Sequence, residues 1–160
     1  MQNIENVIGT SGNDIITGDT AVNRLVGGGG NDILSGRIGA DVLEGGAGVD
    51  TIDYSYSSDR IELDMTILTG GFFEISVGGG LYVDTASGIE NIEGSAGADL
   101  ITGDSNDNVI NGLGADDTIN AGGGADTVDG GDGQDIINGG AGADTIRGGD
   151  DSDTLNGGDA

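Results

Sequence analysis

GGDGQDIIN, residues 130–138, runs without a break into GGAGADTIR at 139–147 and GGDDSDTLN at 148–156. Each stretch of nine residues has glycines first, an Asp at position six and an aliphatic residue at position eight. Glycine allows positive backbone φ at little steric cost, so the first half of each nonamer predicts a tight turn. Positions seven to nine predict a very short strand with position eight facing inward.

The nine-residue period runs through two blocks of the chain. Nonamers start at Gly9, Gly18, Gly27, Gly36 and Gly45, and again at Gly94, Gly103, Gly112, Ala121, Gly130, Gly139 and Gly148. Position six holds Asp14, Asn23, Asp32, Asp41 and Asp50, then Asp99, Asn108, Asp117, Asp126, Asp135, Asp144 and Asp153. Position eight is aliphatic every time: Ile16, Leu25, Leu34, Leu43, Ile52, Ile101, Ile110, Ile119, Val128, Ile137, Ile146 and Leu155.

We therefore expect a first repeat block at 1–53, a connecting non-repeat β segment at 54–93 and a second repeat block at 94–160. A longer duplication relates the blocks, because Ile4-Glu5-Asn6-Val7 matches Ile89-Glu90-Asn91-Ile92 at an offset of 85. Asp14 and Asp99 share that offset.

The connecting segment holds all five aromatic residues of the chain. Apolar residues alternate at Ile61, Leu63 and Met65 and again at Phe73, Ile75 and Val77, which predicts strands. Glycines at 70–71 and 78–80 predict turns. Our main interpretation is an insert that extends or caps the sheet, and a ligand-binding aromatic patch is the alternative.

Composition excludes several classes of function. The 160 residues carry four Lys and Arg against 29 Asp and Glu, a formal net charge of −25, so nucleic acid and anionic lipid are poor partners. No apolar run is long enough for a membrane span. Without His, Cys or Lys the usual nucleophile–base pairs are missing, and we expect no enzymatic activity.

The spacing of the carboxylates favours calcium. Two nonamers would make one coil of 18 residues, so that residue i lies beside residue i+18 in the next coil. Stacked carboxylates repel unless a cation lies between them, and glycine-rich turns bring backbone carbonyls to the same gap. A set of about six oxygen ligands is typical of Ca²⁺, whereas zinc prefers His and Cys, and Mg²⁺ gives up its water reluctantly.

GGAGADTIR and its neighbours resemble the GGxGxDxUx nonapeptide of the repeats-in-toxin (RTX) family of secreted bacterial proteins. The resemblance covers twelve nonamers, about two thirds of the chain. It implies an all-β fold, a right-handed parallel β-roll or β-helix solenoid with several Ca²⁺ ions between stacked Gly/Asp turns. It also implies a secreted, extracellular module that belongs to a larger polypeptide and leaves the cell by type I secretion.

The resemblance further implies a ligand set for each gap between coils. One half-site gives the carbonyls of positions two and four and the position-six carboxylate, and the next coil gives the carbonyls of positions one and three and its own carboxylate. The implied sets are Gly28, Gly30 and Asp32 with Gly45, Ala47 and Asp50; Gly122, Gly124 and Asp126 with Gly139, Ala141 and Asp144; and Gly131, Gly133 and Asp135 with Gly148, Asp150 and Asp153. The same rule reaches Gly112, Gly114, Gly130 and Asp132, beside Asp99 and Asp117.

Departures from the repeat weaken some gaps. Asn23 and Asn108 remove charge from the gaps that they share with Asp41 and Asp126. We expect ions in the six gaps with two Asp, and least in the Asp14–Asp32 gap.

Three functions remain open at this point. The first is calcium binding that folds a structural module outside the cell, where calcium is abundant, while the chain stays disordered at low calcium. The second is a polysaccharide-targeting module attached to an extracellular enzyme such as an alginate epimerase. The third is an adhesin or surface-layer repeat, or an ice-binding surface.

Overall fold

The computed structural model describes residues 5–67 and 71–159. Within these ranges the chain forms β-strands and no helices. Seven strands form one sheet: β2 (Ile15–Thr17), β4 (Ile33–Ser35), β6 (Thr51–Asp53), β10 (Asn91–Glu93), β12 (Val109–Gly114), β14 (Thr127–Asp132) and β16 (Thr145–Asp150). Ten form the other: β1 (Asn6–Ile8), β3 (Arg24–Gly29), β5 (Val42–Ala47), β7 (Ile61–Asp64), β8 (Phe73–Val77), β9 (Tyr82–Ser87), β11 (Leu100–Thr102), β13 (Thr118–Asn120), β15 (Ile136–Asn138) and β17 (Thr154–Asn156).

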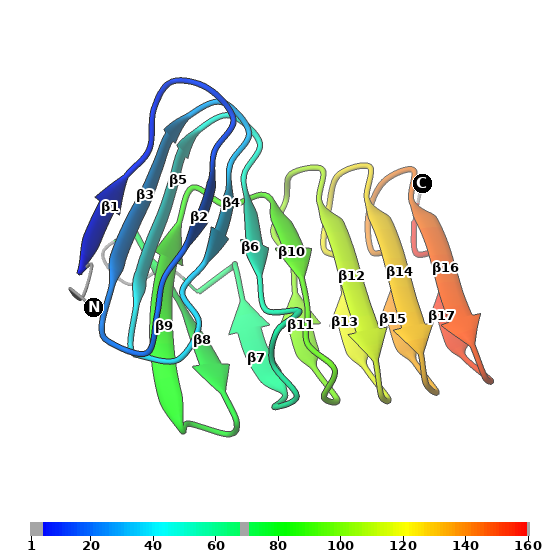
Figure 1. The fold of residues 1–160 in the computed structure, drawn as a ribbon. Helices are drawn as coiled ribbons and strands as arrows, with labels where there is room; N and C mark the ends of the chain where they lie inside the picture. Colours follow the sequence, from blue (N-terminus) through cyan, green and yellow to red (C-terminus); the bar gives the residue numbers. More distant parts are fainter. Residues whose placement is uncertain (1–4, 68–70, 160) are drawn as a thin grey trace.

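The repeats stack as a parallel β-solenoid. Within each block the chain alternates between the two sheets, and Thr127 pairs with Thr145 while Ile136 pairs with Thr154 in parallel register. This register confirms the 18-residue coil predicted from the nonamers. Figure 1 shows the coils side by side within each block, with the two ends of the chain at opposite ends of the molecule.

The position-eight residues form the core between the sheets. Ten of the twelve are buried, from Ile16 to Ile137, as the repeat predicts. Ile146 is partly buried and packs against this core. Leu155 departs from the prediction: it is 50% exposed, because no described strand lies beyond β17 to cover it.

The connecting segment widens only one of the sheets. β7 and β8 pair antiparallel, as do β8 and β9, while β9 pairs parallel with β5 and β7 pairs parallel with β11. In the other sheet β6 pairs directly with β10, so the seven-stranded sheet continues from the first block into the second. Figure 1 shows β7, β8 and β9 between the two stacks of coils.

The predicted strands of the connecting segment are confirmed. Ile61 and Leu63 on β7, and Phe73, Ile75 and Val77 on β8, point into the core and are buried; Met65, just after β7, is buried as well. Gly71 and the glycines at 78–80 lie in turns, and Gly70 lies outside the described residues. Tyr54 is buried too, so it cannot contribute to an open aromatic patch.

The offset-85 duplication places equivalent residues on opposite sheets. β1 lies in the ten-stranded sheet, whereas its counterpart β10 lies in the seven-stranded sheet. Asp14 therefore comes just before a strand of the seven-stranded sheet, and Asp99 just before a strand of the ten-stranded one. The two copies differ by half a coil because the extra strands of the connecting segment change the sheet in which the second copy begins.

We predict that Leu43→Ala lowers the free energy of unfolding by about 2–5 kcal/mol, because it leaves a cavity at a fully buried site. Leu155→Ala is the matched control at the same repeat position, and half-exposure limits its cost to about 1 kcal/mol. Urea unfolding followed by circular dichroism measures both. Equal losses would show that position eight is not the core of the coil.

Candidate metal centre

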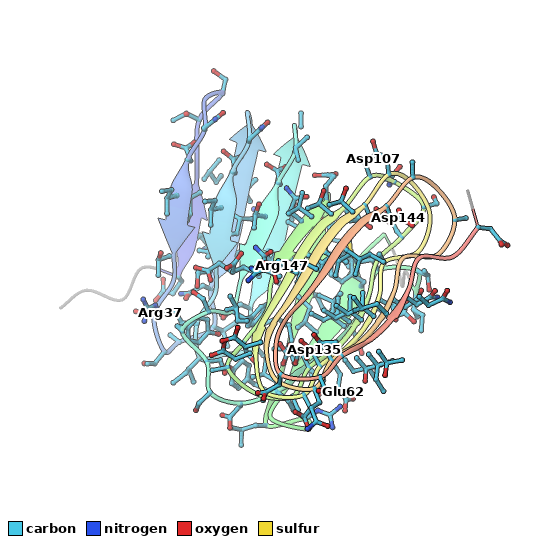
Figure 2. All side chains as sticks on the ribbon, turned by 90° about the vertical axis from the view of Figure 1, so that its right-hand side faces the viewer. Arg37, Glu62, Asp107, Asp135, Asp144 and Arg147 are labelled. Atoms are coloured by element: carbon cyan, nitrogen blue, oxygen red, sulfur yellow. The ribbon has the colours of Figure 1, made fainter. Side chains whose placement is uncertain are left out.

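The position-six residues line the two edges of the solenoid. Edge one comprises the turns that lead into the seven-stranded sheet, with Asp14, Asp32, Asp50, Asn108, Asp126 and Asp144. Edge two comprises the turns that lead into the ten-stranded sheet, with Asn23, Asp41, Asp99, Asp117, Asp135 and Asp153. Figure 2, which looks along the coils of the second block, shows Asp135 and Asp144 near opposite turns of a flattened coil.

One oxygen of each stacked carboxylate is held by the backbone of the preceding coil. The Asp117 N–H donates to Asp135 Oδ1 at 2.8 Å, and the Asp126 N–H donates to Asp144 Oδ1 at 3.0 Å. The same bond joins Asp32 to Asp50 at 2.8 Å. Because these bonds link residues 18 apart, they fix each carboxylate against the coil beneath it.

The other oxygen has no such partner in most repeats. Oδ2 is buried and accepts no hydrogen bond in Asp32, Asp41, Asp50, Asp117, Asp126, Asp135 and Asp144. A buried carboxylate oxygen without a donor or a cation carries a large desolvation penalty. These oxygens therefore mark places where the fold requires a positive partner.

Four turns donate a hydrogen bond from within the loop to their own position-six side chain, and we call them closed loops. Their position-two residues are Thr10, Asp19, Ser95 and Asp104. Each position-two N–H donates to the position-six side chain four residues on, as from Ser95 to Asp99 Oδ2 at 2.8 Å. Each position-two side chain also accepts the N–H of position four, as from Gly97 to Ser95 Oγ at 3.1 Å.

The other eight turns have positive φ at both position two and position four, and we call them open loops. Position two is mostly glycine, such as Gly131 at 108°, but Arg37 and Leu113 hold the same conformation at 69° and 81°. A residue with a side chain pays a steric cost there. The position-six Asp of an open loop is the one left with an unpartnered Oδ2, apart from Asp153 in the last coil.

Carbonyl oxygens meet the unpartnered carboxylate oxygens in the open gaps. A Cβ added to Gly112 would lie closer than 3.0 Å to both Asp117 Oδ2 and the Gly130 carbonyl oxygen. The same holds at Gly130 for Asp135 Oδ2 and the Gly148 carbonyl oxygen. Two oxygens from successive coils thus face one point in each of these gaps, where a Cβ on Gly112 or Gly130 would collide with both.

Electrostatics disfavour the charged carboxylates in the absence of a cation. Burial raises the pKa of the Asp117 carboxyl to about 8; the Asp99 backbone hydrogen bond opposes this, and the charges of Asp99 and Asp135 add to it. Burial is also the main cause of the raised pKa of Asp50, Asp126 and Asp135. An ion between the coils would stabilise the charged form of these groups.

The donor set suits Ca²⁺ because it consists of oxygen alone. Within residues 5–67 and 71–159 no three acidic side chains gather at one point, so backbone carbonyls or water would have to complete any metal shell. The carbonyls of Gly122 and Ala141 each accept one backbone N–H across their gap at 2.9 Å, and each keeps a second lone pair. Carboxylate and carbonyl oxygens are the ligands that Ca²⁺ takes in proteins.

The structure brings together some of the predicted ligand residues of the open gaps. The Gly45 carbonyl lies near Asp32 Oδ2, the Gly130 carbonyl near Asp117 Oδ2 and the Gly148 carbonyl near Asp135 Oδ2. Asp14 differs, because its Oδ2 accepts from the Thr10 N–H at 2.6 Å and from the Thr10 hydroxyl at 3.0 Å.

Sequence reasoning missed the distinction between the two kinds of loop. The sequence signal for a closed loop lies at position two. There the side chain of Ser, Thr or Asp favours a local turn, because it accepts the N–H of the residue two positions on. Sequence reasoning also missed Asp84, which takes the place of a position-six residue on edge two. Asp84 Oδ1 accepts the Asp41 N–H at 2.7 Å, although no nonamer includes Asp84.

Comparison with known proteins gave one family. The model for the "RTX calcium-binding nonapeptide repeat (4 copies)" matches residues 3–34, 17–52, 84–119, 102–137, 112–146 and 129–160. These segments cover both repeat blocks and leave out most of the connecting segment. No curated protein matches the chain. In the described ranges no helix is present that could cross a membrane.

We predict that Gly130→Ala lowers the free energy of unfolding by about 1–3 kcal/mol, because its Cβ would collide with Asp135 Oδ2 and the Gly148 carbonyl. Gly123→Ala is the control, since its Cβ would meet nothing closer than 3.7 Å, and it should change stability by less than about 0.5 kcal/mol. Urea unfolding at saturating calcium compares them, and equal effects would contradict the crowded gap.

Proposed function

Since the chain belongs to the RTX calcium-binding nonapeptide repeat family, we propose that its calcium ions fold it into a structural module of a secreted bacterial protein. Calcium binding by a structural repeat module is the property of the family. The observation that carries the proposal is the row of buried, unpartnered Oδ2 atoms in the open loops.

Four gaps hold the ions in this proposal. Each has an open loop below and an Asp in both coils: Asp32–Asp50, Asp117–Asp135, Asp126–Asp144 and Asp135–Asp153. In each gap the lower loop offers the carbonyls of positions two and four, and the upper loop those of positions one and three. Gly131, Gly133, Gly148 and Asp150 would so complete the shell between Asp135 and Asp153.

The gaps led by Asp14 and Asp99 hold no calcium in this proposal. The Ser95 N–H and the Ser95 hydroxyl both donate to the Asp99 carboxylate, and Ile61 N–H donates to its Oδ1 at 2.7 Å. An ion in this gap would have to displace hydrogen bonds that already stabilise the carboxylate. Closed loops therefore stack without a cation.

Calcium acts as a folding switch in this account. The ligands of each gap come from two coils, so a site exists only in the folded chain, and binding energy becomes folding energy. A formal charge of −25 keeps the calcium-free chain expanded. Low calcium inside the cell then leaves the chain unfolded for export, and higher calcium outside folds it.

We predict that the chain in EDTA lacks the β-sheet signal in circular dichroism and gains it cooperatively on addition of calcium. Magnesium at the same concentration should not replace calcium, because Mg²⁺ gives up its water reluctantly. A chain that is equally folded in EDTA and in calcium would contradict the proposal.

We predict that Asp135→Asn reduces the number of bound calcium ions by two, because Asp135 faces the gaps to both Asp117 and Asp153. Asp99→Asn is the matched control and should lose none, since Asn already occupies position six in the closed loops at Asn23 and Asn108. Native mass spectrometry at saturating calcium counts the ions. Loss of ions in the Asp99 variant alone would reverse the assignment of open and closed loops.

A further inference from the structure

Asp50 has an unpartnered carboxylate oxygen on the side where the nonamers of the first block end. The side chain is fully buried and its Oδ2 accepts no hydrogen bond. Its loop is open, with Gly46 at φ 116° and Gly48 at φ 139°. The nonamer pattern offers no partner for this oxygen, because the next coil comes from the connecting segment.

Glu90 occupies the place of the missing position-six residue. β10 pairs with β6 so that Asn91 faces Thr51, which places Glu90 beside Asp50. Glu90 Oε2 accepts the Asp50 N–H at 2.8 Å, as Asp50 Oδ1 accepts the Asp32 N–H at 2.8 Å. The Asn91 N–H in turn donates to the Asp50 carbonyl at 2.9 Å, which repeats the bond from Thr51 to Asp32.

Gly88 supplies the carbonyl that position one supplies elsewhere. A Cβ added to Gly45 would lie 2.6 Å from Asp50 Oδ2 and would collide with the Gly88 carbonyl oxygen. At Gly27 the same test finds Asp32 Oδ2 and the Gly45 carbonyl oxygen. The Asp50 gap thus presents the same pair of oxygens as the Asp32 gap beneath it.

The two gaps differ in how the upper side is built. Only five residues separate Ala86 on β9 from Ile92 on β10, whereas eight separate Leu43 from Ile52. The shorter turn has no room for positions three to five of a nonamer. The glutamate side chain, one methylene longer than aspartate, reaches across the space that this turn leaves, and it can bind a cation through both oxygens.

No basic side chain is available to pair with Asp50. The four arginines are the only Lys or Arg of the chain. Arg24, Arg60 and Arg147 form ion pairs with Glu44, Glu62 and Asp129, and the Arg37 guanidinium lies over the Tyr56 ring. A cation from solution is therefore the partner that this gap requires.

On the opposite edge, tyrosine hydroxyl groups bond to the oxygens around the Asp41–Asp84 gap. Tyr54 Oη donates to Asp84 Oδ2 at 2.6 Å, and Tyr56 Oη donates to the Arg37 carbonyl at 2.6 Å. The atoms nearest to a Cβ added at Gly36 all belong to Asp41, whereas at Gly45 the nearest atom is the Gly88 carbonyl oxygen. Both edges thus cross the connecting segment by a backbone N–H to a carboxylate, and on edge two the Tyr54 and Tyr56 hydroxyls also occupy the Asp84 carboxylate and the position-two carbonyl of Arg37, although Asp41 Oδ2 stays unpartnered.

We propose that Asp50, Glu90 and the carbonyls of Gly46, Gly48 and Gly88 form a further Ca²⁺ site, which joins the two repeat blocks. This inference rests on the proposed function, because it assigns to the connecting segment the ion that the nonamers use elsewhere. Asp50 would serve two ions, as Asp135 does.

Native mass spectrometry at saturating calcium tests the junction site. Glu90→Gln should bind one ion fewer than the unaltered chain, because it keeps the acceptor for the Asp50 N–H but loses the charge. Glu93→Gln is the control on the same strand: its carboxylate accepts from Asn111 Nδ2 outside the gap, and the ion count should not change. An equal count in the Glu90 and Glu93 variants would overturn the junction site.

A second pair of variants tests the site even if the Glu90 variant fails to fold. Asp50→Asn should lose two ions and Asp32→Asn one, because the gap below Asp32 begins with the closed loop of Thr10. Equal losses in this pair would also overturn the junction site. Binding of no calcium by the unaltered chain would instead overturn the proposed function as a whole.

Discussion

Buried carboxylate oxygens without a partner are the constraint on which the rest of this structure depends. The stacking of coils places an Asp every 18 residues along each edge, and burial removes most of the water that would otherwise solvate it. A hydrogen bond from the coil beneath satisfies one oxygen only. The second oxygen finds a donor in its own loop in the closed turns, and in the open turns it is left without one, which is where our proposal places a cation.

The two solutions are distributed along the chain in a regular way. Closed loops occupy the first two nonamers of each block, where Thr10, Asp19, Ser95 and Asp104 hold position two. Open loops follow. Each block therefore begins with one coil whose two turns hydrogen-bond their own position-six side chains. The duplication at offset 85 thus includes these turns as well as the strands.

Much of the fold could be predicted from the sequence. The period of nine fixes the 18-residue coil, and the aliphatic residue at position eight fixes which side of each strand faces the core. The arrangement of β7, β8 and β9 could not be predicted, because alternation identifies strands such as Ile61–Asp64 but not their neighbours in the sheet. The half-coil shift between the two blocks follows from how β7, β8 and β9 pair, so it could not be predicted from the sequence either.

The position-six Asp residues could also be predicted, but their unequal environments could not. A consensus treats Asp99 and Asp117 alike, whereas the backbone conformation at Ser95 and Leu113 decides which of them keeps a free oxygen. The roles of Asp84 and Glu90 could not be predicted from the sequence. Both residues reach the edges through pairing between strands that are distant in sequence, and the nine-residue period does not indicate this pairing.

Long-wavelength X-ray diffraction from crystals grown with calcium tests the central claim most directly, because an anomalous difference map locates each ion. Our account predicts peaks above the open loops that end in Asp32, Asp117, Asp126 and Asp135, and none above the closed loops that end in Asn23 and Asn108. Peaks above the closed loops, or open gaps that hold only water at saturating calcium, would contradict it.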